Sequence, residues 1–332
     1  MYNALKKIFN IESSFKGTVK HKIFTIFGIR IKHKVKVSKN LWKFVRNKRP
    51  KPLDKSIEAP REKVYLSIVG IFKDEPDIIE WIEYHKLVGV ERFYLYDNDS
   101  ALDYETILKP YIDDKTVIYK KVQGKCMQVP VYRDAIYRYK SETEWLAIID
   151  LDEYIVPVEK SNLKDFLKDY DNYPAIVANW VMFDSNGLKK RDKNKTVIES
   201  FTRVYKNYQE PKNKTIKTIV KPKEVRFIQS VHACLYQNNR LAVDENFKSF
   251  EGTLYFRTEN NSINKIRINH YHCKSREEYL SKIVKGFADR KTTRSFNEEN
   301  LNFKNTTNDY IILKYLPELK ERIREKRQIW IH

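Results

Sequence analysis

The sequence predicts an α/β fold in which a mostly parallel central sheet carries helices on both faces. From about residue 64, apolar runs of strand length alternate with segments of helical periodicity. The apolar runs are nearly continuous, as expected of strands that are buried on both faces. A hydrophobic fraction of 41% in 332 residues is enough for a core, and only eight glycines argue against Gly-rich repeats.

The elements are expected in the following order. Val64 to Phe72 is the first strand, and a helix follows Pro76 over residues 77–87, with apolar residues at 78, 79, 81 and 82 and an end near Gly89. Further strands are expected at 92–97, 117–122, 145–149 and 175–183, and further helices at 104–111, 130–139 and 163–170.

A later segment combines a strand and a helix start. Ile266, Ile268, His270 and His272 alternate, which predicts a strand that leaves the core. The S-x-x-E spacing at 275–278 predicts a capping box that opens an amphipathic helix. A second helix, rich in charged residues, is expected at 311–329.

The first 60 residues differ in charge from the rest. They hold 16 Lys/Arg and 3 Asp/Glu (16 − 3 = +13), whereas the net charge of the whole chain is +20, so the other 272 residues carry +7. We therefore expect three parts: a basic N-terminal extension and linker at 1–60, with a short basic strand or hairpin near 29–37, a main domain at 61–295, and a helical tail at 296–332. The extension could be a solvated arm, could contact an anionic membrane surface or could bind nucleic acid, although it has no nucleic-acid-binding motif.

The spacing of the cysteines and the length of the apolar stretches indicate the cellular compartment of the protein. Cys126, Cys234 and Cys273 are widely spaced without a CxxC, which favours a reducing compartment over a disulfide scaffold. The strongly apolar stretch at 23–29 is far shorter than the ~20 residues that span a bilayer. We expect a soluble cytoplasmic protein, with a peripheral position on the inner face of the cell membrane as an option.

Acidic residues follow three of the predicted strands. These strand ends are Lys73-Asp74-Glu75, Asp97-Asn98-Asp99-Ser100 and Asp150-Leu151-Asp152-Glu153. In a parallel sheet these ends meet at one edge, where ligands bind. Carboxylate oxygens there suit a divalent cation.

The spacing Asp-x-Asp is weak by itself, because it also occurs at 97/99 and 169/171. Asp150 and Asp152 stand out because they follow a buried strand, and on an extended backbone both carboxylates would share one face. The alternative is an exposed acidic turn. His270 or His272 could complete a metal shell, although either could instead be a hydrogen-bonded core histidine.

Cationic and polar residues suggest where phosphates and sugars would lie. Lys274 precedes a helix start, which favours anion binding. Gln128 and Arg133 could reach a phosphate or sugar, or could belong to a solvated face. A later basic and apolar stretch could line the acceptor side; it contains Lys217, Lys221 and His232.

An ordered set of motifs over about residues 64–290 resembles glycosyltransferases of the family 92 and family 2-like group, which have a GT-A fold. The motifs are Lys73-Asp74-Glu75, Glu80-Trp81 with His85, Phe93 to Ser100, Trp145 to Tyr154, Asn179 to Phe183, Ser185-Asn186-Gly187, and Asn269-His270-Tyr271 with Lys274-Ser275. Asp74 and Asp184 depart from the pattern, where Asn and Gly are expected.

The resemblance implies transfer from a nucleotide-sugar, a UDP-sugar, to a hydroxyl of a glycan or lipid-linked glycan with Mn²⁺ or Mg²⁺. Asp150, Asp152 and His270 match the metal and diphosphate residues. The strand-end residues match the base and ribose site; they are Lys73, Asp74, Glu75, Asp97, Asn98 and Ser100. The basic leader resembles bacterial enzymes of envelope-polysaccharide synthesis that act at the cytoplasmic membrane face.

If the reaction inverts, a carboxylate would deprotonate the acceptor hydroxyl. Asp184 and Glu199 are the candidate bases, Asp184 because its loop follows the fifth strand. Two other functions remain open: a non-catalytic protein that binds nucleic acid or membrane through its basic arm, and a metal-dependent nucleotidyltransferase. We expect no nucleic acid partner.

Overall fold

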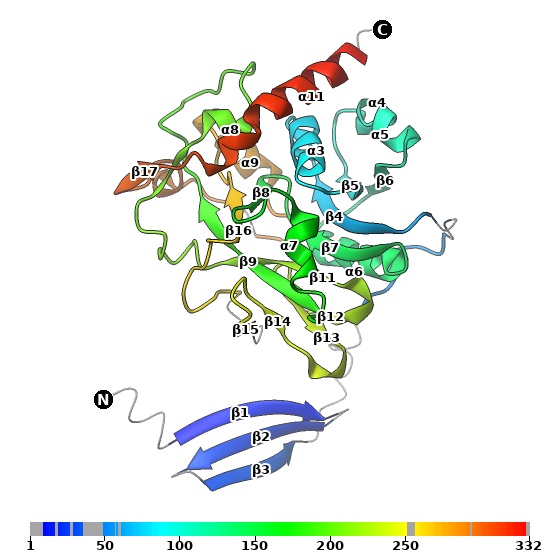
Figure 1. Ribbon diagram of the computed structural model, residues 1–332, viewed down its shortest axis with the longest axis vertical. Coiled ribbons are helices and arrows are strands. Elements are labelled where there is room, and N and C mark those ends of the chain that lie inside the picture. Colours follow the sequence, from blue (N-terminus) through cyan, green and yellow to red (C-terminus); the bar gives the residue numbers. More distant parts are fainter. Residues whose placement is uncertain are drawn as a thin grey trace. The chain divides into compact units, whose positions relative to one another are not determined.

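The computed structural model describes residues 9–16, 19–26, 29–35, 49–56, 58, 61–250, 256–292 and 294–329. The chain forms two compact units, residues 1–49 and residues 50–332 (Figure 1). The smaller unit contains β1 (Phe9–Lys16), β2 (Val19–Ile26) and β3 (Ile29–Val35), which pair in this order as an antiparallel sheet. The predicted basic strand near residue 29 is therefore present, as β3.

Four strands form the parallel part of the main sheet. They are β4 (Val64–Phe72), β5 (Arg92–Asn98), β6 (Val117–Val122) and β7 (Thr143–Ile148), in the order β7-β4-β5-β6. The connections contain α3 (Ile78–Leu87), α4 (Tyr104–Ile107), α5 (Lys109–Asp113) and α6 (Gln128–Tyr139). These bounds confirm the predicted alternation of strand and helix.

The other half of the sheet is mixed. β11 (Ile216–Val220) lies between β7 and β9 (Ala175–Met182) and is antiparallel to both, so that β9 runs in the direction of β7. The remaining strands are β8 (Glu153–Pro157), β14 (Ala242–Val243), β15 (Ser249–Phe250) and β16 (Ile266–His270). Because β14 and β16 are parallel to β9, seven of the ten strands in the described sheet run in one direction.

Both faces of the sheet are covered, as predicted. One apolar cluster joins Leu66 and Ile68 of β4 to α3 and to α7 (Leu163–Lys168), whereas the other joins Val69 and Ile71 to α6. Successive residues of β4 thus point to opposite faces. The alternation explains why the strand is apolar throughout.

Shorter elements complete the larger unit. β10 (Arg203–Tyr205) pairs with β17 (Thr306–Asn308), and β12 (Val225–Ile228) pairs with β13 (Cys234–Tyr236). The helical segments are α8 (Val197–Ser200), η1 (Pro222–Glu224), η2 (Gln237–Asn239), α9 (Arg276–Lys285), α10 (Glu298–Leu301), η3 (Ile311–Tyr315) and α11 (Leu316–Ile329). The predicted capping box of Ser275 and Glu278 is present at the start of α9.

The segment after residue 296 packs on the larger unit. Arg267 of β16 and Asp309 form a buried ion pair, with Nη2 2.6 Å from Oδ1. The predicted boundaries at residues 60 and 295 stay predictions. No helix in the described part of the chain has the length and apolar character needed to cross a membrane.

Candidate active site

The candidate site lies at the carboxyl ends of the parallel strands. β4 leads into Asp74 and Glu75, β5 ends at Asn98, and the turn from β7 to β8 contains Asp150 and Asp152. β16 ends at His270 beside this turn, because the backbone N–H of Tyr271 donates to the carbonyl of Asp152 (2.9 Å). The sheet therefore brings together residues that lie up to about 200 positions apart.

Asp152, His270 and His272 form the one group in the described residues that could hold a metal ion. One ligand atom from each lies within 4.8 Å of the others. His270 Nε2 is 3.4 Å from Asp152 Oδ2, and His270 Nδ1 is buried without a hydrogen-bond partner among the described residues. A carboxylate with two imidazoles is a donor set that suits a first-row divalent ion. The residues present therefore fit a divalent ion, and which ion binds stays a prediction.

The protonation states also suit metal binding. Burial lowers the pKa of His270, although Asp152 opposes this shift, and burial together with the charge of Lys282 holds the pKa of His272 well below its usual value. Burial opposes ionisation of Asp152, but Lys282 and His270 hold the pKa of this carboxyl well below its usual range. Neutral imidazoles and an ionised carboxylate are the forms that bind metals.

Asp150 lies outside this group. Residues 151 and 152 form a turn instead of the extended backbone that the sequence suggested, so the two carboxylates have different partners. Asp150 Oδ2 is 2.9 Å from Lys217 Nζ, and its Oδ1 accepts hydrogen bonds from Gln128 Nε2 (2.6 Å) and Tyr132 OH (3.1 Å). Metal binding by Asp150 stays a prediction.

Gln128 and Lys217 therefore act on Asp150 in this structure. Lys217 is fully buried on β11, and its ammonium is also 3.5 Å from Glu153 Oε2. The sequence suggested that Lys217 could line the acceptor side, which stays a prediction. In the structure, β11 lies next to β7 and brings Lys217 to Asp150. Arg133 lies on α6 and is 7% exposed, and its role toward a phosphate or sugar stays a prediction.

The ends of β4 and β5 form a compact polar cluster. Ser100 Oγ accepts from the Asp74 backbone N–H (2.9 Å), and Asp97 Oδ1 accepts from the Ser100 N–H (3.0 Å). Asn98 Nδ2 donates to the carbonyl of Val122 on β6 (3.2 Å).

An open hollow of about 740 Å³ adjoins this cluster, and Asp97 and Ser100 are among its lining residues. Lys73 is exposed directly after β4. The structure thus brings together the strand-end residues predicted to bind the donor, whereas their role in binding stays a prediction.

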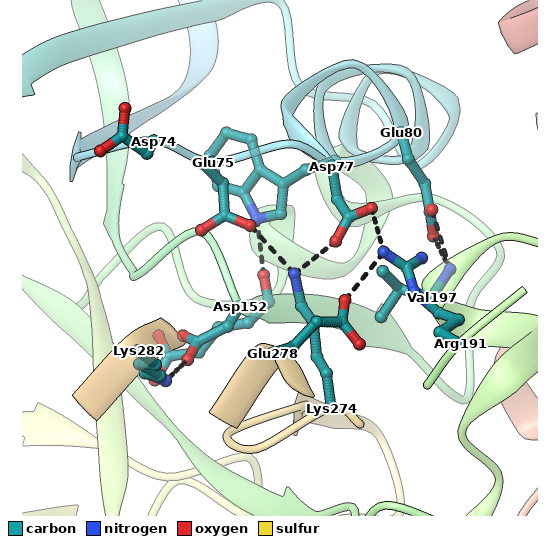
Figure 2. A network of polar contacts seen from close by, with 12 residues as sticks. Asp74, Glu75, Asp77, Glu80, Asp152, Arg191, Val197, Lys274, Glu278 and Lys282 are labelled. Atoms are coloured by element: carbon teal, nitrogen blue, oxygen red, sulfur yellow. Dashed lines mark hydrogen bonds and ion pairs between the residues drawn. The ribbon is translucent and has the colours of Figure 1, made fainter. Parts of the chain in front are cut away.

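Lys274 lies in a network of alternating charges (Figure 2). Its ammonium contacts Glu75 Oε1 (2.9 Å) and Asp77, and Arg191 joins Asp77 (2.6 Å) to Glu278 (2.9 Å). Burial opposes the charge of Lys274, but Asp77 and Glu75 raise its pKa far above the usual value. The predicted anion-binding lysine is thus engaged by two carboxylates.

The two candidate bases lie in structural contacts. The Asp184 side chain is fully buried and accepts hydrogen bonds from Arg203 Nε (2.8 Å to Oδ2) and from the backbone N–H groups of Asn186 (2.9 Å) and Phe303 (3.0 Å). Glu199 on α8 pairs with Lys320 of α11 (2.8 Å). These contacts do not favour either carboxylate as a base, and both assignments stay predictions.

Sequence reasoning did not identify two cations at the site, Arg191 and Lys282. Lys282 of α9 contacts Asp152 and donates to the carbonyl of His272 (2.8 Å). The one sequence feature that could have pointed to Lys282 is its position in the amphipathic helix predicted after the capping box. Arg191 lies in a polar loop that carries no motif.

Comparisons with known proteins identify the family of the chain. The glycosyltransferase family 92 profile matches residues 62–315. A family 92 protein of Ricinus communis is 32% identical over 115 residues, which cover 33% of this chain and 21% of that protein. The galactan beta-1,4-galactosyltransferase GALS3 of Arabidopsis thaliana is 25% identical over 209 residues, which cover 58% of this chain and 37% of that protein.

Among solved structures, a crystal structure of S. aureus TarS 1–349 in complex with UDP has a TM-score of 0.35 and 14% identity, covering 66% of this chain and 63% of that chain. The chain spans about a fifth of the Ricinus relative and just over a third of GALS3. The family profile, in contrast, covers most of the chain and includes all the strand ends of the site. The protein belongs to glycosyltransferase family 92.

Proposed function

We propose that the protein transfers a sugar from a UDP-sugar to a hydroxyl of a glycan or lipid-linked glycan, in a reaction that depends on Mn²⁺ or Mg²⁺. Family membership supports sugar transfer. The observation that carries metal dependence is the group of Asp152, His270 and His272 at the carboxyl ends of the strands. The name of GALS3 favours galactose as the first sugar to test.

Asp152, His270 and His272 would hold the ion, which when bound would supply positive charge to balance the leaving diphosphate. The chain itself prepares these side chains. β16 and the β7–β8 turn hold His270 against Asp152, and burial lowers the pKa of both imidazoles, which favours their neutral forms. Such preorganised groups need little rearrangement during the reaction.

The nucleoside would bind at the ends of β4 and β5. The hollow there is lined by Asp97, Ser100 and further polar residues, which can hydrogen-bond to ribose hydroxyls and base edges. Asp97 is itself held by Tyr119 OH (2.7 Å) and the Ser100 N–H, so its carboxylate has a fixed position. A donor bound there would extend toward Asp152 along the same edge of the sheet.

The direct test is a panel of nucleotide-sugars incubated with the protein and Mn²⁺. We expect UDP with Mn²⁺ to raise the melting temperature, because a ligand that binds only the folded state stabilises it. A matching UDP-sugar should release UDP, and more so with an acceptor glycan. Release of pyrophosphate instead of UDP would indicate a nucleotidyltransferase, and the absence of any nucleotide effect would overturn the proposal.

We also propose that the protein acts at the inner face of the cell membrane in polysaccharide synthesis. The support is the +13 charge of residues 1–60, since clustered Lys/Arg are attracted to anionic lipid. Vesicles with and without anionic lipid test this by sedimentation. Equal binding to both, or none to either, would contradict it.

A further inference from the structure

Lys282 reaches the candidate metal group from α9. Its ammonium contacts Asp152 Oδ2, and it lies 3.3 Å from His272 Nδ1 and 2.8 Å from the carbonyl of His272 (Figure 2 shows the contact with Asp152). The cation thus touches two of the three side chains that could hold the ion. His272 Nδ1 accepts a hydrogen bond from the ammonium when the ring proton is on Nε2.

An ammonium and a divalent ion compete for the same side chains at this point. An ionised carboxylate has lone pairs for both, but an imidazole nitrogen has only one, so His272 Nδ1 cannot bind a metal ion while it accepts a hydrogen bond from the ammonium. The positive charge of Lys282 would also repel an incoming ion at this short range. Both effects favour withdrawal of Lys282 when the ion enters.

The surroundings of Lys282 allow such a movement, in contrast to those of the other two lysines at the site. Lys217 is fully buried, the Lys274 side chain is 9% exposed, and each contacts two carboxylates. The Lys282 side chain is 25% exposed and pairs with the single carboxylate of Asp152. A flexible four-carbon stem at a partly exposed position can turn toward solvent, and the incoming ion then replaces the ammonium beside Asp152.

We propose that Lys282 is a built-in competitor of the divalent ion: it holds Asp152 and His272 in place when the ion is absent and is displaced when the ion binds. This inference rests on the proposed function, because it assumes that the ion binds to Asp152, His270 and His272. Lys282 acts through these ligands and is therefore a positioning residue. Its role is to keep the two ligands oriented and the carboxylate charge balanced between turnovers.

The test measures Mn²⁺ binding by titration calorimetry without any donor, for the full chain and for Lys282→Met and Lys282→Gln. Both variants remove the competing charge, so we expect the Kd for Mn²⁺ to fall by about tenfold. If Lys282 were only a structural support, its loss would weaken Mn²⁺ binding or leave it unchanged. Either of those results in both variants would overturn the inference.

Lys190→Met is the matched control. It removes the same charge from a lysine whose ion pair with Glu277 at the start of α9 is more than half exposed, so its Kd for Mn²⁺ should equal that of the unmodified chain. The melting temperatures of all variants show that they are folded, and Lys282→Gln keeps a polar group if Lys282→Met does not fold.

The outcomes also separate this inference from the proposed function. If the unmodified chain binds Mn²⁺ and UDP but the two Lys282 variants bind Mn²⁺ no more tightly, the role of Lys282 is refuted and the proposed function stands. If no form of the protein binds Mn²⁺ or Mg²⁺, the role of Lys282 and the metal dependence are both refuted, whereas sugar transfer itself is decided by the UDP-release assay.

Discussion

Two regions of the site use charge in opposite ways. In the first, Glu75, Lys274, Asp77, Arg191 and Glu278 alternate in sign, and each cation contacts two carboxylates. In the second, the metal group, one buried nitrogen of His270 has no partner among the described residues and one carboxylate is shared between a histidine and a lysine. We call the first the complete region because each of its cations pairs with two carboxylates, although Arg191 Nε is buried without a hydrogen-bond partner among the described residues. We call the second the open region because Lys282 pairs there with a single carboxylate.

This difference indicates that the first region stabilises the fold and that the second binds a ligand. The complete network joins the start of α3, the loop at Arg191 and the start of α9, so its role is to fix these elements around the site. In the open region, His270 Nδ1 is buried without a hydrogen-bond partner among the described residues, and a water molecule or an ion can satisfy such an atom. Mutations should therefore reduce stability in the first region and ligand binding in the second.

The largest effect is expected for Asp152→Asn, in the open region. It removes the carboxylate of the metal group, so Mn²⁺ binding should be lost and sugar transfer should fall by about a hundredfold or more, since a catalytic ion supplies several kcal/mol. Calorimetry with Mn²⁺ and a UDP-release assay measure the two effects. Near-normal turnover with an unchanged melting temperature would refute the metal site.

The next effect is expected for Lys274→Met, in the complete region. Loss of the Lys274 ammonium leaves Glu75 without this ion pair and Asp77 paired with Arg191 alone. Because removal of one partner from a buried ion pair leaves an uncompensated charge, the free energy of unfolding should fall by about 3–5 kcal/mol. Urea unfolding measures this loss. Lys282→Met serves for comparison, and its free energy of unfolding should fall much less. Equal losses in the two variants would contradict the division between the two regions.

Glu80 gives the complete region a pH dependence. Burial, with the charge of Asp77 added, raises the pKa of this carboxyl from 4.5 to about 7. The folded state thus binds a proton more tightly than the unfolded state, and the resulting stability is present below pH 4.5 and lost as pH rises through 7. The loss amounts to about 3 kcal/mol at most.

Glu80→Gln tests this by removing the titrating group. The difference in unfolding free energy between the unmodified chain and the variant should shift in favour of the variant as pH rises from 4.5 to 7. Urea unfolding at several pH values measures it, and other titrating groups cancel in the difference. A constant difference across this range would show that Glu80 stays ionised when folded.

The smallest effect is expected for Asp184→Asn, which separates a base from a structural carboxylate. Loss of the ion pair with Arg203 should lower stability by about 1–3 kcal/mol, while turnover per folded molecule should stay within a few-fold. Urea unfolding and the UDP-release assay are measured on the same samples. A large loss of turnover without a loss of stability would make Asp184 the base after all.

The sequence alone determined most of the order of elements from β4 to β9 and the edge of the sheet that carries the site, but it did not predict β8, β11, β14 or β15. Near-continuous apolar runs specify β4, β5, β7 and β9, because strands buried on both faces need apolar residues at most positions. β6, at the edge of the described sheet, contains Lys120 and Lys121 and is only partly buried. The capping box fixed the start of α9, because both of its hydrogen bonds lie within four consecutive residues. Local patterns were sufficient wherever the deciding contacts are local.

Only the tertiary structure decided which partner each charged residue has. The pairs Asp150–Lys217 and Asp152–Lys282 join residues 67 and 130 positions apart, and no short-range pattern encodes them. The turn at residues 151 and 152 directs one aspartate toward β11 and the other toward His270. Burial of Asp184 likewise depends on Arg203 and on the segment at Phe303. The sequence specifies which residues are charged. Which of them form ion pairs depends on the distant segments that the packed sheet brings into contact.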